Sequence, residues 1–287
     1  LRVYTTLDMD YQRLAEDIAR RQVSQLKAAH NMNNASVIVM RPDTGEILAM
    51  VGSVNYDDES IDGNVNMTTA ARQPGSAMKP FTYAAALEKG WSTAQVIWDT
   101  EVRIGLPGQP PYVPVNYDRT FHGPVRLREA LANSYNIPAV QTLRFVGVDY
   151  LLWMMSRVGV TSLGNDASHY GLSLTLGGGE VSPLELTTAY SVLANGGVYV
   201  PHRAIRCITN SSNEILYEYQ QSCPPGARLT ERSRTFNADG RQVLDPRIAF
   251  VLSDILADNA ARTPAMGANS PLNTPGLPTS VKTGTTN

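Results

Sequence analysis

The first residues in this chain that could do chemistry are a serine and a lysine three positions apart, Ser76 and Lys79. They follow Pro74-Gly75 at the predicted start of a helix, where backbone N–H groups have no helical partner. Residues three apart share a helix face, so the lysine amine can reach the serine hydroxyl. A serine needs a neighbouring base to become a nucleophile. The pair therefore predicts acyl transfer, provided that the pKa of Lys79 is lowered enough to make it neutral.

A second group, Ser134-Tyr135-Asn136, lies between two predicted helices and just before Pro138. A hydroxyl and a carboxamide two residues apart can point the same way across an extended turn. Ser134 is therefore a candidate for relaying a proton to a leaving amine. Asn136 is a candidate for binding a substrate amide.

A third group, Lys282-Thr283-Gly284-Thr285, is predicted to lie in an extended strand over 279–286. Its glycine would let another backbone approach closely, as a peptide pairing along an edge strand requires. Lys282 and the threonine hydroxyls suit a carboxylate. The N–H of Thr285 could join that of Ser76 in stabilising an oxyanion. Lys282 is also the second cation expected to lower the pKa of Lys79.

Taken singly, each group has an ordinary structural explanation: a serine helix cap with a solvated lysine, a polar turn between helices, and an exposed strand. Their occurrence together and in this order favours a catalytic site. The chain contains only four lysines beside 20 arginines, and two of the four stand in these groups. The sequence thus predicts a serine enzyme in which lysine, rather than histidine, acts as the base.

Composition argues against several other classes of protein. The chain has 287 residues, 43% hydrophobic and 17% charged, which fits a globular enzyme of one large or two small domains. A formal net charge of -2 gives no electrostatic reason to expect nucleic acid or an anionic membrane as the main partner. The richest apolar stretch, 145–155, is too short to span a bilayer. The four histidines are scattered, and we expect neither a metal nor a cofactor.

The elements that position these groups can be predicted from periodicity. Apolar residues at helical spacing predict a helix over 9–30, with one buried stripe made of Leu14, Ala15, Ile18, Val23 and Leu26. Two short apolar segments, 35–40 and 46–51, flank a turn containing Pro and Gly and predict a hairpin.

A helix over 76–89 would carry the first group, and helical patterns at 125–133 and 139–146 flank the second. The intervening stretch 100–123 is rich in Pro and Gly and is predicted to be irregular. Another helix is predicted over 246–257, ahead of the last strand. Strands, then a run of helices, then a strand indicate an α+β fold.

The only two cysteines, Cys207 and Cys223, flank a predicted hairpin of strands 205–210 and 214–220. That hairpin places Cys223 several residues beyond the position opposite Cys207. A disulfide is allowed but not required by this arrangement. The sequence therefore leaves the redox compartment open.

The three groups match the Ser-x-x-Lys, Ser-x-Asn and Lys-Thr-Gly signatures of penicillin-binding proteins and related β-lactamases. No Glu-x-x-Leu-Asn motif follows Ser134-Tyr135-Asn136, which argues against a class A β-lactamase. The surrounding sequence resembles the transpeptidase domain of class A (bifunctional) penicillin-binding proteins. The supporting stretches are 3–8, 72–76, 128–134 and 176–186.

This resemblance implies a peptidoglycan D,D-transpeptidase. Its nucleophile would attack the D-Ala-D-Ala bond of a stem peptide, release D-Ala and pass the acyl group to an amine of a neighbouring strand. β-Lactam antibiotics would trap the same serine. Matching the motifs gives Ser76 as nucleophile, Lys79 as base, and Ser134 and Asn136 in proton relay and amide binding. Lys282, Thr283 and Thr285 would bind the terminal carboxylate, and Gly284 would be a further substrate-binding residue.

Related readings of the same site stay open. A D,D-carboxypeptidase or β-lactamase would pass the acyl group to water, and a β-lactam-sensing domain would keep the adduct without turnover. The resemblance also implies action at the extracytoplasmic face of the bacterial cell membrane. Contact with the membrane is expected only through an N-terminal anchor that this chain does not contain.

The resemblance further implies a penicillin-binding/serine β-lactamase-like fold, an antiparallel sheet with a helical subdomain. We expect residues 1–34 to form an opening strand and helix that link to a glycosyltransferase domain outside this chain. Residues 35–287 are expected to form the transpeptidase domain. That domain is expected to be truncated at its C-terminus, because further strands and a closing helix of the family's sheet would follow residue 287.

Overall fold

The computed structural model of this chain mixes helices with mainly antiparallel strands, which confirms the predicted α+β class. It describes residues 1–106, 108–237 and 240–285. Within these ranges no helix is both long and apolar enough to span a bilayer. The chain divides into two compact units, each made of two stretches of sequence: Leu1–Ala71 with Ser182–Val243, and Arg72–Val181 with Leu244–Asn287. Whether residues 1–34 act as a linker stays a prediction.

The first unit begins with strand β1 (Arg2–Thr5) and the predicted 22-residue helix α1 (Met9–His30). The side chain of Asp8 accepts hydrogen bonds from two first-turn backbone N–H groups and so caps the start of the helix. Asn31 adopts the left-handed conformation and ends it.

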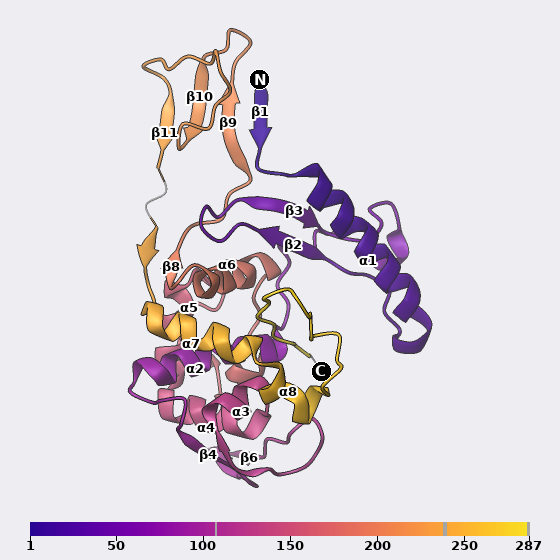
Figure 1. Cartoon of the computed structure of the whole chain (residues 1–287), viewed down its shortest axis with the longest axis vertical. Helices are drawn as coiled ribbons and strands as arrows, with labels where there is room; N and C mark the ends of the chain where they lie inside the picture. The colour runs from indigo at the N-terminus through magenta and orange to yellow at the C-terminus, as the bar shows by residue number, and fades with distance from the viewer. Residues whose placement is uncertain (107, 238–239, 286–287) are drawn as a thin grey trace. The chain divides into compact units, whose positions relative to one another are not determined.

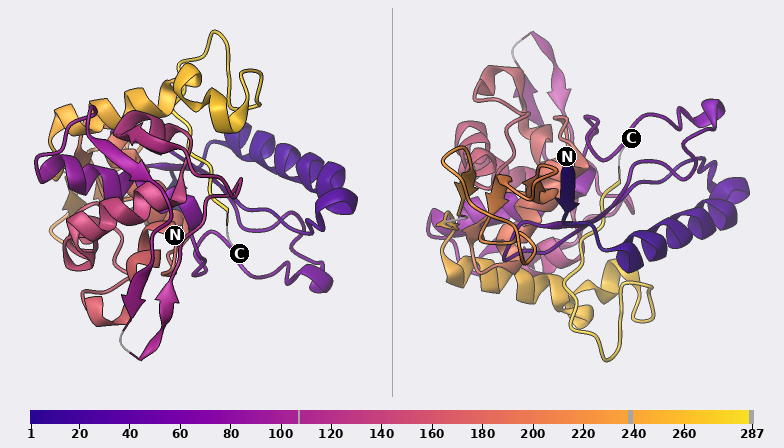
Figure 2. Two further views of the ribbon diagram at one scale, coloured as in Figure 1. Left: turned by 90° about the horizontal axis from the view of Figure 1, so that it is seen from below. Right: turned by 90° about the horizontal axis from the view of Figure 1, so that it is seen from above.

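The buried face of α1 includes Ala15 and Val23, as predicted, but not the whole predicted stripe. Its buried residues are four apart: Ala15, Ala19 and Val23. Leu14 and Ile18, which were expected inside, are 53% and 43% exposed. The small alanine side chains let α1 lie close against strand β3 (Ile47–Val51), so the neighbouring stripe of larger residues turns outward. Figure 2 shows α1 alongside this strand.

The strands of the first unit form small sheets. Strand β2 (Val37–Met40) and β3 make the predicted antiparallel hairpin. A four-stranded sheet has the order β1-β9-β10-β11, antiparallel except for the parallel pair β10–β11. Its members after β1 are β9 (Ile205–Thr209), β10 (Ile215–Tyr219) and β11 (Arg234–Phe236). The remaining elements are η1 (Glu59–Ile61), α6 (Pro183–Ala194), β8 (Val198–Tyr199) and β12 (Arg241–Gln242).

A disulfide joins Cys207 in β9 to Cys223. The predicted hairpin places Glu218 of β10 opposite Cys207. Gln220 and Gln221 then both adopt positive φ angles, 48° and 53°, and this turn folds the chain back. The two cysteine Cα atoms are 5.2 Å apart as a result. The sequence alone did not predict this turn, because neither glutamine is a typical left-handed residue.

The second unit is built around helix α2 (Lys79–Glu88), of which eight of the ten residues are buried. A helix that is apolar on every side belongs in a core. Helices α3, α4, α5 and α7 all contact it (Figure 1). The Thr82 hydroxyl adds a buried hydrogen bond of 2.7 Å to the hydroxyl of Thr175. Lys79, the first residue of α2, is therefore held in place by the core of this unit.

The helices of the second unit are η2 (Gly75–Met78), α2, α3 (Leu127–Ala132), α4 (Asn136–Val146), α5 (Val148–Arg157), η3 (Ala167–His169), η4 (Leu172–Leu176), α7 (Pro246–Ala257) and α8 (Asn259–Met266). Its strands are β4 (Val96–Asp99), β5 (Ile104–Leu106), β6 (Gln109–Tyr112) and β7 (Gly123–Arg126). Strands β5 and β6 form an antiparallel pair inside the stretch predicted to be irregular. Helix α8 was not predicted, because Pro264 lies within it.

The predicted last strand is not formed over residues 279–285, and residue 286 lies outside the described residues. A strand needs a neighbouring strand to pair its backbone groups. No strand in the described part of the chain pairs with this segment. Instead, the Val281 N–H donates to the Leu256 carbonyl of α7 at 3.0 Å. The expectation of a strand was therefore wrong for the described residues.

Candidate active site

Ser76 and Lys79 lie at the junction of two short helical segments. The single 3-10 turn η2 contains Ser76, and α2 begins at Lys79, whose backbone N–H donates to the Ser76 carbonyl. Ser76 is partly exposed, whereas Lys79 is completely buried. The predicted helical spacing thus places the hydroxyl at the surface of the unit and the amine beneath it.

The turn between α3 and α4 is tightly defined. Ser134 has φ +58°, a left-handed conformation that costs a non-glycine residue about 1–3 kcal/mol. The N–H groups of Ser134 and Tyr135 donate back to carbonyls of α3, each at 3.1 Å. Asn136 then starts α4. This conformation points the Ser134 and Asn136 side chains to the same place, as the sequence predicted.

That place is the amine of Lys79. Lys79 Nζ donates to the Ser134 backbone carbonyl, lies 2.7 Å from Asn136 Oδ1 and is 3.3 Å from Ser134 Oγ. The carbonyl and the amide oxygen can only accept, whereas the hydroxyl can also donate. A neutral amine, with two N–H donors and one lone pair, is therefore compatible with these neighbours.

Lys282 converges on the same turn from 148 residues further along the chain. Its Nζ donates to Ser134 Oγ at 2.8 Å and to the Thr283 carbonyl at 2.7 Å. Both amines are therefore within hydrogen-bond distance of one oxygen, Ser134 Oγ. A hydroxyl between two amines can pass a proton from one to the other.

Burial and charge change the acidity of both lysines. Desolvation, reinforced by the nearby charge of Lys282, holds the pKa of Lys79 well below its ordinary value of 10.5. Desolvation also lowers the pKa of Lys282 to about 7. Both effects disfavour an ammonium that has lost its water and gained a like charge. A neutral amine is thus available beside Ser134 without alkaline conditions.

A cavity of about 450 Å³ opens over this arrangement, a size that suits a small ligand. The predicted residues that line it are Ser76, Ser134, Asn136, Thr283 and Thr285. The sequence assigned no role to five further lining residues: Tyr117, Asp118, Asn133, Tyr135 and Leu176. Three residues of the unpredicted helix α8 also line it: Pro264, Ala265 and Met266.

Two glycines allow backbone segments to pack directly beside the serine. A Cβ on Gly75, which has φ +56°, would lie 2.2 Å from the Thr285 carbonyl oxygen. A Cβ on Gly284 would lie 2.8 Å from the Pro74 carbonyl oxygen. The sequence predicted that Gly284 admits a substrate backbone; in the structure the chain's own residue 74 occupies that space. These contacts bring residues 282–285 to the candidate nucleophile in the absence of a strand.

The structure thus brings all three predicted groups into one part of the second unit. No cluster of three or more metal-binding side chains occurs within the described residues. The sequence did not predict a buried polar cluster of Asp99, Asn116 and His122 next to Asn136. These residues fall in or beside the Pro- and Gly-rich stretch, where no periodic pattern distinguished them.

A serine, two converging amines of lowered pKa and a cavity define a serine acyltransferase type of site. The sequence matches the penicillin binding protein transpeptidase domain family over residues 35–287. This chain therefore belongs to that family.

Curated relatives are class A penicillin-binding proteins. Penicillin-binding protein 1A of Haemophilus influenzae is 33% identical over 196 residues, 68% of this chain and 22% of the relative. Penicillin-binding protein 2D of Bacillus subtilis is 32% identical over 260 residues, 89% of this chain and 33% of the relative. The chain therefore spans between about a fifth and a third of the length of these relatives.

Solved structures agree with this membership. The crystal structure of penicillin-binding protein 1A from Haemophilus influenzae superposes with a TM-score of 0.65 at 29% identity, covering 79% of this chain and 35% of that one. The penicillin-binding protein PonA1 from Mycobacterium tuberculosis shares the fold, with a TM-score of 0.74 at 19% identity over 96% of this chain and 66% of that one. The predicted resemblance and fold are confirmed.

Proposed function

We propose that this chain is the acyl-transfer part of a peptidoglycan D,D-transpeptidase, with Ser76 as the nucleophile. One observation carries the proposal: the amines of Lys79 and Lys282 both contact Ser134 Oγ, beside a cavity that Ser76 lines. A solvated lysine or a simple helix cap would not need such convergence. Family membership adds support, since the relatives are penicillin-binding proteins.

In the acylation step, neutral Lys79 takes the hydroxyl proton of Ser76 while Oγ attacks the carbonyl carbon of the D-Ala-D-Ala bond. The backbone N–H groups of Ser76 and Thr285 would stabilise the oxyanion, because both residues line the cavity. As the C–N bond breaks, the proton on Lys79 passes through Ser134 Oγ to the leaving D-Ala amine. An ester on Ser76 and free D-Ala result.

In the second step an acceptor amine attacks the ester. The amine loses a proton to Lys79 as the new amide bond forms. The ester C–O bond to Ser76 then breaks, and Lys79 returns the proton to Ser76 Oγ. Lys282, as an ammonium, and the hydroxyls of Thr283 and Thr285 would bind the carboxylate of the donor peptide. Asn136 would contribute to binding a donor amide through its carboxamide. Gly284 serves this arrangement through its close packing on residue 74.

We further propose that the protein works at the extracytoplasmic face of the cell membrane. Peptidoglycan stem peptides and β-lactam antibiotics would be its ligands. The Cys207–Cys223 disulfide supports an oxidising compartment, because cytosolic thiols are kept reduced. Residues 1–34 would link this chain to a glycosyltransferase domain and, through it, to a membrane anchor.

Mass spectrometry after brief exposure to a penicillin tests the nucleophile. We expect one covalent adduct, mapped to Ser76 and absent from Ser76→Ala. The matched control is Ser156→Ala, since Ser156 is a helical serine outside the cavity, hydrogen-bonded to the Trp153 carbonyl at 2.9 Å. An adduct on another residue would overturn the assignment.

Release of D-Ala from a stem-peptide analogue, with and without an amine acceptor, tests the reaction. A cross-linked product that replaces hydrolysed product as acceptor is added would support transfer. Hydrolysis alone would make the protein a carboxypeptidase or β-lactamase. A long-lived penicillin adduct without any peptide turnover would make it a β-lactam-sensing domain.

A further inference from the structure

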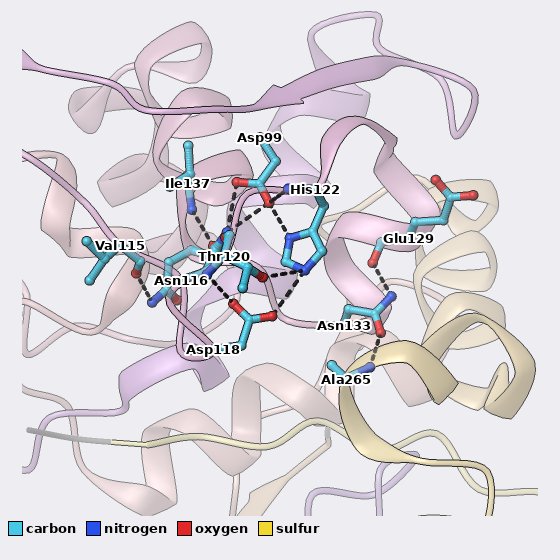
Figure 3. Close-up of polar contacts among 11 residues, drawn as sticks. Asp99, Val115, Asn116, Asp118, Thr120, His122, Glu129, Asn133, Ile137 and Ala265 are labelled. Carbon is cyan, nitrogen blue, oxygen red and sulfur yellow. Dashed lines mark hydrogen bonds and ion pairs between the residues drawn. The ribbon is translucent and has the colours of Figure 1, made fainter.

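A second polar cluster lies beside the candidate active site and takes no part in the reaction proposed above. Asp99 is completely buried, and Asn116 is only 3% exposed. Asn116 Nδ2 donates to the two carboxylate oxygens of Asp99 at 2.9 and 2.8 Å, and to the Thr120 carbonyl at 2.9 Å. Figure 3 shows these contacts. A buried carboxylate with such partners is a specific arrangement, because a buried charge is costly unless it is fully hydrogen-bonded.

His122 completes the cluster. Its backbone N–H donates to Asp99 Oδ2 at 3.1 Å, and its ring Nδ1 lies 2.5 Å from the same oxygen. Its Nε2 lies 3.1 Å from Asp118 Oδ2 (Figure 3). Strand pairing explains the proximity: Asp99 ends β4 opposite Gly123, the first residue of β7, so the preceding residue lies beside it.

This cluster contacts the turn that carries the Ser-x-Asn group. Asn116 Oδ1 accepts the backbone N–H of Asn136 at 2.8 Å and that of Ile137 at 3.3 Å. These are first-turn donors of α4, which have no acceptor within their own helix. The ring of His122 stacks on that of Tyr135, with centroids 3.9 Å apart and planes inclined by 17°.

The side chain of Asn136 is held by the same segment. Its Nδ2 donates to the Val115 carbonyl at 2.8 Å, and its Oδ1 faces Lys79 Nζ at 2.7 Å. Adjacent residues 115 and 116 thus fix the carboxamide and the backbone of Asn136 respectively. The oxygen that remains is the one directed at the candidate base.

We propose that Asn116, together with Asp99 and His122, positions Asn136 against Lys79 for acyl transfer. The inference rests on the function proposed for the site. Asp99 has a definite part in it: a carboxylate only accepts, so Asn116 must present its NH₂ to Asp99 and its oxygen to α4. Without that constraint the Asn116 carboxamide could rotate by half a turn and withdraw the acceptor.

A double-mutant cycle tests this coupling. Asn116→Ala is expected to lower the rate constant for acylation of Ser76 by penicillin about 10²-fold, the effect of a displacement of roughly 1 Å at a catalytic group. In an Asn136→Ala background the same change should have no further effect, because the group that it positions is gone. Independent, additive losses from Asn116→Ala and Asn136→Ala would overturn the proposal.

The pH profile separates positioning from general damage to the fold. Asn136 Oδ1 accepts a hydrogen bond from Lys79, which favours the ammonium and so opposes the lowering of the pKa of Lys79. Asn116→Ala should therefore move the acid limb of the acylation profile to lower pH. Thr142→Val is the matched control, since it removes a buried hydrogen bond of 2.7 Å to the Pro138 carbonyl within the same helix. Its profile should keep the wild-type shape, and an equal shift in both variants would contradict the positioning role.

Amide hydrogen exchange provides a readout that does not depend on chemistry. Asn116→Ala should accelerate exchange at the N–H groups of Asn136 and Ile137, and Asp99→Asn should do so to a smaller extent. Thr142→Val should leave these two amides protected. Unchanged exchange in Asn116→Ala would refute the positioning network. A different outcome would refute the proposed function but not the network: penicillin fails to acylate the wild-type protein, while Asn116→Ala shows the expected faster exchange.

Discussion

The two halves of the candidate site are held in very different ways. One half, the rigid half, consists of Ser76, Lys79 and the turn 134–136. It is fixed by the buried helix α2, by the end of α3 and by the start of α4. The other half, the open half, consists of residues 282–285. It has no strand neighbour in the described part of the chain, and its Gly284 and Thr285 are exposed. It is attached to α7 through hydrogen bonds made by Ser280 and Val281.

This contrast corresponds to the two tasks that acyl transfer sets. A lysine base must be desolvated and held at a fixed distance from the nucleophile, which requires burial in a packed core. A carboxylate-binding segment must remain open to an extended ligand, which requires surface. Substitutions in the half that controls proton transfer should therefore mainly lower the acylation rate. Substitutions in the half that binds the carboxylate should mainly weaken ligand affinity.

Replacing each lysine is the strongest test of this division. Lys79→Ala should lower the acylation rate constant at saturating penicillin by about 10³-fold, within the range for loss of a general base. Lys282→Gln should act mainly by raising the penicillin concentration needed for half-maximal rate, because the carboxylate loses its cation. Stopped-flow measurement of acylation against penicillin concentration separates the two.

Lys89→Ala is the matched control for both variants. Lys89 lies at the far end of α2, where its amine donates to the Val146 carbonyl at 2.9 Å, outside the cavity. Its loss should leave acylation within about twofold of wild type, as expected for a change away from the site. Equal effects of Lys79→Ala and Lys282→Gln on the saturating rate would remove the distinction between the halves.

The pH dependence of kcat/KM should report the ionisation of both lysines, Lys79 and Lys282. Activity should rise as Lys79 loses its proton, at a pH well below 10.5 because burial and the charge of Lys282 lower its pKa. Activity should fall above about pH 7, where Lys282, whose pKa is lowered to about 7, loses the charge that holds the carboxylate. Each limb should approach a tenfold change per pH unit.

Lys282→Gln sharpens this test. The alkaline limb should disappear. The acid limb should move to higher pH, because Lys79 no longer has a cation beside it to disfavour its own protonation. An acid limb at its wild-type position would show that the two amines do not interact.

Glycine substitutions should separate stability from activity. Gly75→Ala places a Cβ 2.2 Å from the Thr285 carbonyl oxygen at a residue with φ +56°. The strained backbone alone costs about 1–3 kcal/mol, and the clash should lower the free energy of unfolding further. Gly284→Ala meets the Pro74 carbonyl oxygen at 2.8 Å, and its exposed segment can move away. It should therefore cost less stability but weaken penicillin binding. Chemical denaturation and acylation kinetics measure the two effects.

Gly90→Ala provides the control for Gly75→Ala. Gly90 has φ +97° with no atom within 4 Å of an added Cβ, so it carries the backbone strain without the clash. The difference between the two variants in the loss of unfolding free energy gives the cost of the steric clash at residue 75. A difference near zero would mean that residues 74–76 and 283–285 are not packed as the structure has them.

The rigid half was also the more predictable from sequence. The pairing of Ser76 with Lys79 follows from helical spacing alone, and the turn at Ser134 from its place between two helical patterns. The meeting of Lys282 with Ser134 does not follow from any local pattern. It was expected only because three motifs occurred in the order known for a family, and the strand assumed for residues 279–286 did not form in the described residues.

Other misses have physical causes. In helix α1, Leu14 and Ile18 were predicted to be buried together with Ala15 and Val23 as one stripe. Close packing on β3 buries the small Ala15 and Ala19 and leaves the larger Leu14 and Ile18 exposed. The Asp99–Asn116–His122 cluster (Figure 3) depends on the pairing of β4 with β7, a long-range contact across a stretch without periodicity.

The smallest expected effect concerns stability in the open half. Lys282→Met should raise the free energy of unfolding by about 1 kcal/mol below pH 7, since it removes a cation that burial disfavours. The folded-state pKa of Lys282, about 7, lies below the ordinary value of 10.5, so between these pH values the unfolded chain binds more protons. Wild-type stability therefore rises with pH in this window, and the advantage of Lys282→Met shrinks and then reverses toward pH 10.5. Urea denaturation of both proteins at several pH values measures this. A constant difference would mean that the Lys282 amine is solvated, and the open half would then lack the buried cation on which its carboxylate binding depends.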